Sequence, residues 1–450
     1  MSEGRAAGSL GFSTSRRAAV RFIYSFLHYL ITPVLLIRLL WRGLRNPGYW
    51  QRWAERFGYG KALPPGRQVI WIHAVSVGEV QAALPLVNAI RERRREAGIL
   101  VTTTTPTGSS RVAHALGEGV EHCYLPYDLP GPVRRFLDRT HPSLAVIMET
   151  ELWPNLLHGC RIRNIPVLLA NVRLSERSAA GYGRFRHLVE EMLAGVSAVA
   201  AQGDADARRI IALGADPARV TVTGSVKFDI NIPPSLREEA ASLRRRLGSE
   251  RSVWIAASTH DGEEHAVLEA FRKVRAAVPG ALLMIVPRHP ERFGTTETLV
   301  KRARFDYGLR SRARDSYRGI DVFIGDSMGE LQMFYAASDV AFVGGSLVPV
   351  GGHNMLEAAA LGIPVIFGPH VFNFASISAR LLELDIARRV ANAAELAEAV
   401  VAYLQDANTR HNVGQAAKRF VAENRGARDK VAEIIDALLS TAEAAPPHGA

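Results

Sequence analysis

The chain has 450 residues, of which 48% are hydrophobic and 22% are charged, a balance that excludes disordered and fibrous proteins. The formal net charge of +11 favours a partner with negative charge, such as nucleic acid, anionic lipid or a phosphorylated substrate. The two cysteines, Cys123 and Cys160, lack CxxC or Cys/His spacing, which argues against a disulfide scaffold or zinc finger and favours a reducing compartment.

The longest apolar-rich stretch lies near the N-terminus, at residues 20–41. It reaches the roughly 20 mostly apolar residues that a membrane span needs, although a histidine, a proline and an arginine interrupt it. Arginines flank it on both sides, and it is rich in aromatic residues, which settle at lipid–water boundaries. We expect a disordered lead at residues 1–19 and a membrane-anchor helix at residues 20–45, which either crosses the bilayer or lies in its interface. The alternative is an amphipathic helix buried against the globular body.

Short apolar runs alternate with longer helical patterns, such as Glu79–Ala97, over the rest of the chain, which is typical of βαβ units with a parallel sheet. Strands are predicted before residue 230 at Val69–His73, Ile99–Thr103, Leu144–Met148, Val167–Ala170 and Val196–Ala200. Further strands are predicted after it at Val253–Ala257, Ala281–Val286, Asp321–Ile324, Val340–Val343 and Val365–Phe367.

The two sets of strands are separated by Pro233 and Pro234, which fit neither a helix interior nor an inner strand. We therefore expect two doubly wound α/β domains, at residues 46–230 and 237–425, joined by a linker at residues 231–236. A C-terminal helix and tail follow at residues 426–450. Because ligands of open α/β sheets bind beyond the carboxyl ends of the strands, the default site is a cleft between the two domains.

Glu79 is the first candidate for chemistry, because it follows a strand and a Ser/Gly loop at the point where a helix opens. A carboxylate at a strand's carboxyl end suits a general base. The alternative is a glutamate placed in a first helical turn by the helix dipole. The loop is not GxGxxG, so hydride transfer with a dinucleotide loses its main support.

Further polar groups follow other predicted strands. Glu149 and Glu151 follow the third strand and are separated by Thr150. The two side chains need not share a face of the chain, so we expect only one of them to face the cleft. The alternative is an acidic cluster at a helix start. Lys227 lies beside the interdomain break, where a phosphate or carboxylate could meet it. Arg288 follows a strand of the second half and can bind a phosphate or carboxylate through two hydrogen bonds.

A glycine-flanked loop at residues 344–357 is the strongest candidate for an anion site. Its glycines allow close backbone approach, and a helix beginning near Asn354 would offer free N–H groups. Asn354 and Glu357 also have the spacing of a capping box, and both interpretations can hold. The loop lacks the GKS or GKT of a Walker A sequence, which disfavours ATP hydrolysis.

Metal binding is not expected. Asp204 and Asp206 match the DxD pattern of metal-dependent sugar transferases, but helix capping explains them. His260, Asp261 and His265 do not form an HExxH motif.

Seven motifs in order resemble the bacterial 3-deoxy-D-manno-octulosonate (Kdo) transferase family. They are HAVSVGE at 73–79, METELWPN at 148–155, NVRLSERS at 171–178, GSVKFD at 224–229, PRHPERF at 287–293, DSMGE at 326–330 and GGHNMLEAA at 351–359. The likeness runs from about residue 22 to about residue 425 and includes the N-terminal anchor.

The resemblance implies a GT-B architecture, in which two Rossmann-like domains flank a cleft and the first holds the acceptor and the second the CMP group. It implies an inverting, metal-independent enzyme without cofactors that moves Kdo from CMP-Kdo to a lipid A precursor, lipid IVA, in lipopolysaccharide inner-core synthesis. By motif, Glu79 would be the general base, and Glu149 and Lys227 would stabilise the transition state. The nucleotide-binding positions would be Pro287, Arg288, Met328, Gly329, Glu330, Asn354, Met355, Leu356 and Glu357.

The implied partners are CMP-Kdo, lipid IVA and anionic lipids of the inner membrane, at its cytoplasmic face. One alternative is a different GT-B enzyme, either a nucleotide-sugar transferase of peptidoglycan synthesis or an epimerase. Another is a basic, membrane-bound module that binds nucleic acid. The sequence contains no RNP, KH or helix-turn-helix signature and its positive charge is spread along the chain, so we expect no nucleic-acid partner.

Overall fold

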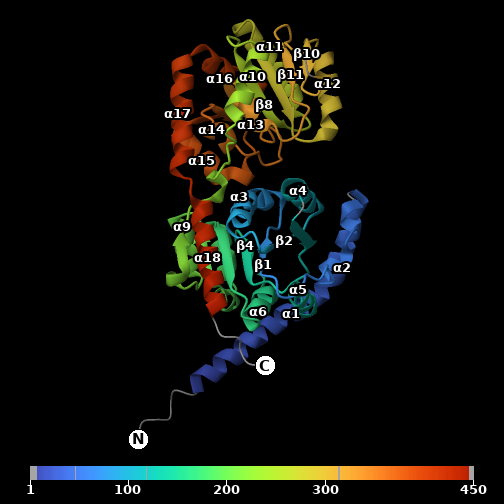
Figure 1. Ribbon diagram of the computed structural model, residues 1–450, viewed down its shortest axis with the longest axis vertical. Coiled ribbons are helices and arrows are strands. Elements are labelled where there is room, and N and C mark those ends of the chain that lie inside the picture. Colours follow the sequence, from blue (N-terminus) through green and yellow to red (C-terminus); the bar gives the residue numbers. More distant parts are fainter. Residues whose placement is uncertain (1–7, 46, 118, 313–314, 445–450) are drawn as a thin grey trace. The chain divides into compact units, whose positions relative to one another are not determined.

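The computed structural model describes residues 8–45, 47–117, 119–312 and 315–444 (Figure 1). The described residues form two compact units. The first contains the chain up to Asp229 together with the residues from Arg425 onward, and the second contains Ile230–Asn424. Each unit is built around a parallel sheet of seven strands.

The first sheet has the strand order β3-β2-β1-β4-β5-β6-β7. Its strands are β1 (Val69–His73), β2 (Gly98–Thr103), β3 (Val120–Tyr124), β4 (Leu144–Met148), β5 (Val167–Val172), β6 (Ala198–Ala201) and β7 (Val220–Val222). Alternate residues of β1 enter different hydrophobic cores, Ile70 and Ile72 on one side and Trp71 on the other. The sheet is therefore covered on both faces, as the near-continuous apolar runs of parallel strands require.

The first unit also contains helices α1–α9 and the last helix of the chain, α18. They are α1 (Gly8–Arg45), α2 (Trp53–Arg56), α3 (Val77–Arg93), α4 (Pro106–Leu116), α5 (Pro130–Thr140), α6 (Pro154–Ile162), α7 (Glu176–Gly183), α8 (Arg186–Ala194), α9 (Asp204–Ala212) and α18 (Ala427–Ala444), with 3-10 turns η1 (Pro47–Trp50), η2 (Pro217–Arg219) and η3 (Val226–Phe228). Helix α18, red in Figure 1, packs on the same core as α3. Asp229 helps to hold it, since its carboxylate accepts the N–H groups of Gly426 and Arg428, each at 2.7 Å.

The second sheet has the strand order β10-β11-β9-β8-β12-β13-β14. Its strands are β8 (Val253–Thr259), β9 (Leu282–Pro287), β10 (Tyr307–Leu309), β11 (Val322–Ile324), β12 (Val340–Val343), β13 (Val365–Phe367) and β14 (Ala387–Arg389). Its helices are α10 (Leu236–Leu247), α11 (Glu263–Ala277), α12 (Phe293–Arg302), α13 (Leu331–Ala336), α14 (Leu356–Ala360), α15 (Ala375–Glu383), α16 (Ala393–Gln405) and α17 (Ala407–Glu423), with 3-10 turns η4 (Pro290–Arg292) and η5 (Phe372–Phe374).

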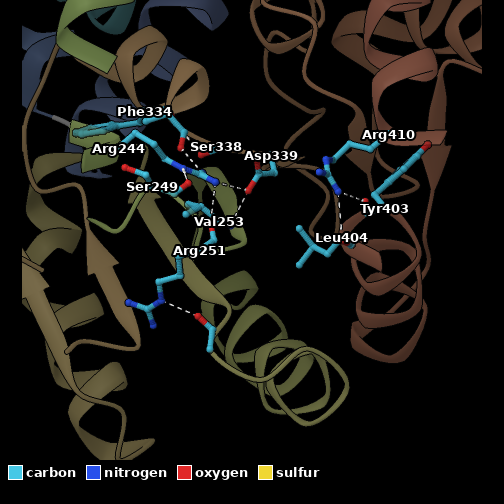
Figure 2. A network of polar contacts seen from close by, with 12 residues as sticks. Arg244, Ser249, Arg251, Val253, Phe334, Ser338, Asp339, Tyr403, Leu404 and Arg410 are labelled. Atoms are coloured by element: carbon cyan, nitrogen blue, oxygen red, sulfur yellow. Dashed lines mark hydrogen bonds and ion pairs between the residues drawn. The ribbon is translucent and has the colours of Figure 1, made fainter. Parts of the chain in front are cut away.

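A polar network fixes the amino ends of β8 and β12 in the second unit, as Figure 2 shows. Arg244 of α10 donates hydrogen bonds to the carbonyl oxygens of Ala337 and Arg251, at 2.8 and 2.6 Å. It also pairs with the carboxylate of Asp339 at 2.9 Å, which in turn accepts the N–H of Val253 at 2.8 Å. The network therefore joins a helix to the start of two neighbouring strands, at the sheet edge opposite their carboxyl ends.

Each of the ten predicted strands overlaps an observed strand, which confirms the α/β class and the doubly wound order. The prediction lacks four strands, β3, β7, β10 and β14, and these are the edge strands of the two sheets. Helix α3 begins at Val77 and ends at Arg93, so the predicted range Glu79–Ala97 begins and ends too late.

Helix α1 corrects the expected disordered lead at residues 1–19, because residues 8–19 are helical and residues 1–7 lie outside the described chain. Once a helix is nucleated, it extends at little further free-energy cost. Its stretch Val20–Leu44 is long and apolar enough, by length and composition, to cross a membrane. One side of the helix contacts α6 and α8 of the first unit, and Ser25 Oγ hydrogen-bonds Asn155 at 3.1 Å.

Candidate active site

The two predicted catalytic carboxylates follow the strands at which the first sheet reverses its order. The chain leaves β1 toward β2 and β3 on one side and resumes with β4 on the other side. Glu79 follows β1 through a short loop, and Glu149 follows β4 directly. Ligands of open α/β sheets bind at such a reversal of strand order, beyond the carboxyl ends of the strands.

Glu79 occupies the third position of helix α3, whose N-cap is Ser76. Its carboxylate accepts the N–H of Val75 at 2.8 Å and the hydroxyl of Ser76 at 3.0 Å. The interpretation as a first-turn glutamate is therefore right, and it does not exclude catalysis, because a carboxylate has further lone pairs that can accept a proton.

The protonation of Glu79 is tuned by its surroundings. The residue is only 8% exposed. Burial raises the pKa of its carboxyl to about 7, and the nearby charges of Glu149 and Glu151 act in the same direction. A carboxyl with a pKa near neutrality is suited to take up a proton at physiological pH and release it afterwards.

Glu149 and Lys227 form an ion pair beside it, with Lys227 Nζ 3.5 Å from Glu149 Oε1. Glu149 has a φ of 58°, in the left-handed region that residues with a side chain rarely adopt, and such strain is characteristic of functional positions. Lys227 lies in the turn η3, whose Val226 N–H is held by the Oδ1 atom of buried Asn171 at 3.2 Å. Asn171 was not among the predicted site residues, although it begins one of the seven motifs.

Glu151 does not belong to this ion pair. Burial raises the pKa of its carboxyl. Helix α6 begins at Pro154 and its first turn holds no acidic residue, so Glu149 and Glu151 are not an acidic cluster within a helix start. This leaves Glu149 as the carboxylate of the loop that contacts the predicted cation Lys227.

The second sheet reverses its order between β8 and β12, and the predicted nucleotide-binding residues lie around that point. Pro287 ends β9 and Arg288 follows it, while the segment Met328–Glu330 follows β11 and the glycine-flanked loop follows β12. The four strands are neighbours in the order β11-β9-β8-β12. The structure therefore brings the loops of three predicted segments to one edge of the second sheet, as expected.

The start of the glycine-flanked loop differs from the expectation that its backbone is free for an anion. The N–H groups of Gly345, Ser346 and Leu347 all donate to the carboxylate of Glu263, at 2.7, 3.0 and 2.9 Å. A buried internal carboxylate therefore already occupies the backbone donors at this end of the loop, and it was not predicted.

The end of the loop also differs from the expectation, because α14, which begins at Leu356 close to Asn354 as predicted, has only five residues. Asn354 Oδ1 accepts the N–H of Leu356 at 3.1 Å, and its Nδ2 donates to Glu357 Oε1 at 3.2 Å. Asn354 and Glu357 therefore interact through their side chains, but the N-cap of α14 is Met355, so the predicted capping box is wrong in its N-cap position. A single helical turn is too short to supply the anion site expected from a helix dipole. The side chains of Met355 and Leu356 are buried.

The segment Met328–Glu330 combines an ion-paired glutamate, a glycine with positive φ and an exposed methionine. Glu330 is paired with Arg310 at 2.6 Å, which lowers the pKa of the Glu330 carboxyl. Gly329 has a φ of +86°, which glycine adopts without strain. Met328 is exposed, so an apolar side chain stands beside the predicted nucleotide-binding residues. Arg310 was not predicted, since it lies 20 residues from its partner in the chain.

The DxD residues begin helix α9, as expected, although its N-cap is Gly203 rather than an aspartate. Asp206 accepts the N–H of Leu174 at 2.8 Å. Within the described residues, no three His, Cys, Asp or Glu side chains are grouped so that they could hold a metal ion.

The two sheets and their strand-end sites place the chain among proteins of the GT-B fold. It is similar to a glycosyltransferase from Rickettsia africae, with a TM-score of 0.53 and 14% identity, covering 83% of this chain and 99% of that one. It is equally similar to a putative UDP-N-acetylglucosamine 2-epimerase from Listeria monocytogenes, with a TM-score of 0.53 and 13% identity, covering 86% and 100%. At these identities the likeness shows the fold alone.

Sequence relatives define the family. Residues 51–230 match the model described as 3-deoxy-D-manno-octulosonic-acid transferase (kdotransferase). The chain is 42% identical over 421 residues to the 3-deoxy-D-manno-octulosonic acid transferase of Haemophilus influenzae, covering 93% of this chain and 99% of the relative. It is 36% identical over 431 residues to that of Bordetella pertussis, with the same coverage. The chain therefore belongs to the Kdo transferase family of glycosyltransferases.

Proposed function

We propose that the protein transfers Kdo from CMP-Kdo to lipid IVA in lipopolysaccharide inner-core synthesis, with inversion at the anomeric carbon and Glu79 as general base. The observation that carries this proposal is the buried Glu79 carboxyl, with a pKa of about 7, beside the Lys227–Glu149 ion pair at the reversal of the first sheet. The family names of the relatives and the seven motifs support the substrates.

The proposed reaction is a single displacement. Glu79 takes the proton of an acceptor hydroxyl, whose oxygen forms a bond to the anomeric carbon of Kdo. The bond between that carbon and the phosphate oxygen breaks, and its electron pair leaves with CMP. Attack from the face opposite the leaving group inverts the carbon.

Positive charge assists the departure of CMP in this proposal. Arg288 in the second unit would contact the phosphate, and Lys227 in the first would balance charge in the transition state. Transfer requires the hydroxyl held by one unit and the donor held by the other to meet in the reacting complex. No metal is needed for these steps, so we expect EDTA to leave the rate unchanged.

The activity is tested by incubating the protein with CMP-Kdo and a tetraacyl lipid A precursor and measuring the molecular mass of the lipid product by mass spectrometry. We expect the lipid to gain one or more Kdo residues, and CMP to inhibit more strongly than UDP. A protein that binds UDP more tightly and makes no Kdo-lipid would be a different GT-B enzyme. Binding of duplex or single-stranded nucleic acid at physiological salt, without transfer, would favour the nucleic-acid module.

We further propose that helix α1 holds the protein on the cytoplasmic face of the inner membrane, near its lipid acceptor. Large apolar side chains of the helix are exposed in the structure, among them Phe22, Phe26, Leu30, Val34 and Ile37. Their exposure argues against the alternative of a helix buried on the body. Arginines beside them would attract anionic headgroups by about 1 kcal/mol each.

Replacing Val34 and Ile37 together by aspartate is expected to release the protein from vesicles of phosphatidylethanolamine and phosphatidylglycerol. Both side chains are more than 60% exposed, so the fold should not change, whereas burial of two charges in the lipid is unfavourable. Co-sedimentation with the vesicles measures the bound fraction, and Leu384→Asp, an exposed position on the second unit, is the control. Undiminished binding of the double variant would contradict the anchor.

A further inference from the structure

Three histidines outside the predicted site residues gather at the carboxyl ends of neighbouring strands in the second unit. His260 follows β8, His289 follows β9 and His353 lies in the glycine-flanked loop after β12. The strands β8 and β12 are those at which the second sheet reverses its order. The imidazoles therefore lie at the position where open α/β sheets bind ligands.

His260 and His353 are in direct contact. Their Nε2 atoms are 2.7 Å apart, and the rings are nearly parallel, at 6° with centroids 5.0 Å apart. His289 lies against His260, with ring centroids 5.3 Å apart. A hydrogen bond between two Nε2 atoms requires one ring to donate and the other to accept. A neutral pair therefore holds one proton between the rings and presents one further N–H, on the Nδ1 atom of the ring that accepts.

The loop is shaped around this pair. A side chain at Gly345 would place its Cβ atom 3.0 Å from the His353 ring and 3.5 Å from the His260 ring. Gly345 also has a φ of +67°. A glycine at this position lets both imidazoles lie against the backbone, so their contact is part of the loop's architecture.

The charges around the pair leave an excess of positive potential. Among the charged neighbours, Arg292 pairs with Glu264 and Asp261, at 3.0 and 2.9 Å, and Glu263 is bound to backbone N–H groups. The charge of Glu291 acts on His289, whose pKa it raises. The guanidinium of Arg288 makes no ion pair with a side chain in the described part of the protein.

This environment is unfavourable for a further positive charge and favourable for an anion. Burial, together with the charge of Arg288, lowers the pKa of His260 to about 4 and that of His353 to about 3. The free N–H of the neutral pair and the guanidinium of an arginine without a side-chain counter-ion form a donor set for an anionic ligand.

We infer that the His260–His353 pair binds the carboxylate of the donor's sugar acid, beside Arg288, which contacts the neighbouring phosphate. The inference rests on the proposed function, because CMP-Kdo carries two anionic groups side by side, the phosphodiester and the carboxylate on the anomeric carbon. The segments predicted from the motifs account for the nucleotide and its phosphate. The histidine pair supplies an N–H for the second anion, and a nucleotide sugar without the carboxylate would leave this polar group unpaired.

Isothermal titration of the full-length protein with CMP and with CMP-Kdo, in the absence of acceptor, tests the inference. CMP has the phosphate but lacks the sugar carboxylate. We expect His353→Gln and His260→Gln to weaken CMP-Kdo binding about 10- to 100-fold and to change CMP binding less than twofold. His265→Gln, an exposed histidine on α11, is the matched control and should bind both ligands as the wild type does.

Equal losses for CMP and CMP-Kdo would show that the pair contacts the phosphate or only supports the loop, and would overturn the inference. Unchanged affinity of both variants for both ligands would overturn it as well. Two variants are used because His260 is less buried than His353, so a folding defect of one does not prevent the measurement. Failure of the proposed function is distinguishable, since the wild type would then fail to prefer CMP-Kdo over CMP and to transfer Kdo.

Discussion

Replacing Glu79 by glutamine is expected to lower kcat for Kdo transfer by about 10²- to 10⁴-fold, the usual contribution of a general base. Glutamine keeps the shape, its oxygen can accept the N–H of Val75 and its amide N–H can donate to the Ser76 hydroxyl, but it cannot take a proton from the acceptor. Binding of CMP, which the second unit is proposed to hold, should not change. Rates are measured with CMP-Kdo and lipid IVA, and CMP affinity by titration.

The pH profile of the wild type gives a second readout of Glu79. The base must be ionised, and its pKa is about 7, so kcat/KM should rise with pH up to about 7 and level off above it. The Glu79→Gln variant should lose this limb. Glu151→Gln is the matched control, from the loop whose charge also raises the pKa of Glu79. It should retain most activity and move the midpoint to lower pH.

Thermal stability distinguishes a catalytic role of Glu79 from a purely structural one. Because the folded-state pKa of Glu79 is raised, its ionisation opposes folding, and this penalty develops as pH rises from about 4.5 and is complete above about 7. Glutamine carries no charge, so the variant should melt no lower than the wild type at pH 8. Transfer by Glu79→Gln within tenfold of the wild-type rate would contradict its assignment as the base.

Replacing Glu263 by alanine is expected to destabilise the second unit by about 3–5 kcal/mol, because several buried N–H groups lose their acceptor. The carboxylate binds the N–H groups of Gly345, Ser346 and Leu347 and also that of His260, at 3.0 Å. It thus joins the loop after β8 to the loop after β12. Loss of this connection should also weaken CMP-Kdo binding, since both loops contribute histidines to the proposed carboxylate site.

Urea unfolding followed through Trp254, which is buried in β8, measures the loss. Glu263→Gln retains one acceptor oxygen and should lie between alanine and the wild type. Glu269→Ala, an exposed glutamate of the same helix α11, is the control and should unfold as the wild type does. An unchanged unfolding midpoint and unchanged donor affinity for Glu263→Ala would show that the loops keep their conformation without this carboxylate.

The contacts that organise the predicted site were not predictable from the sequence. Motif resemblance indicated Lys227, Glu330 and the glycine-flanked loop. It assigned no role to Asn171, which begins a motif and holds the turn of Lys227 from 55 residues away, and it gave no sign of Arg310, which pairs with Glu330. Glu263 lies 82 residues before Gly345. Polar pairs of this kind leave no periodic pattern, because their spacing in the chain depends on the folded path between them.

The sequence by itself determined the class of the protein, the inner strands and the positions of the chemical groups that follow them. Inner strands of a parallel sheet are buried on both faces, so they appear as continuous apolar runs. Only the tertiary structure decided the edge strands, such as β3 and β14, since a strand with a single neighbour needs fewer apolar residues and carries charges like those of Arg388 and Arg389. It also decided that α18, at the end of the chain, belongs to the first unit, because that placement depends on which core has an uncovered face after both sheets have formed.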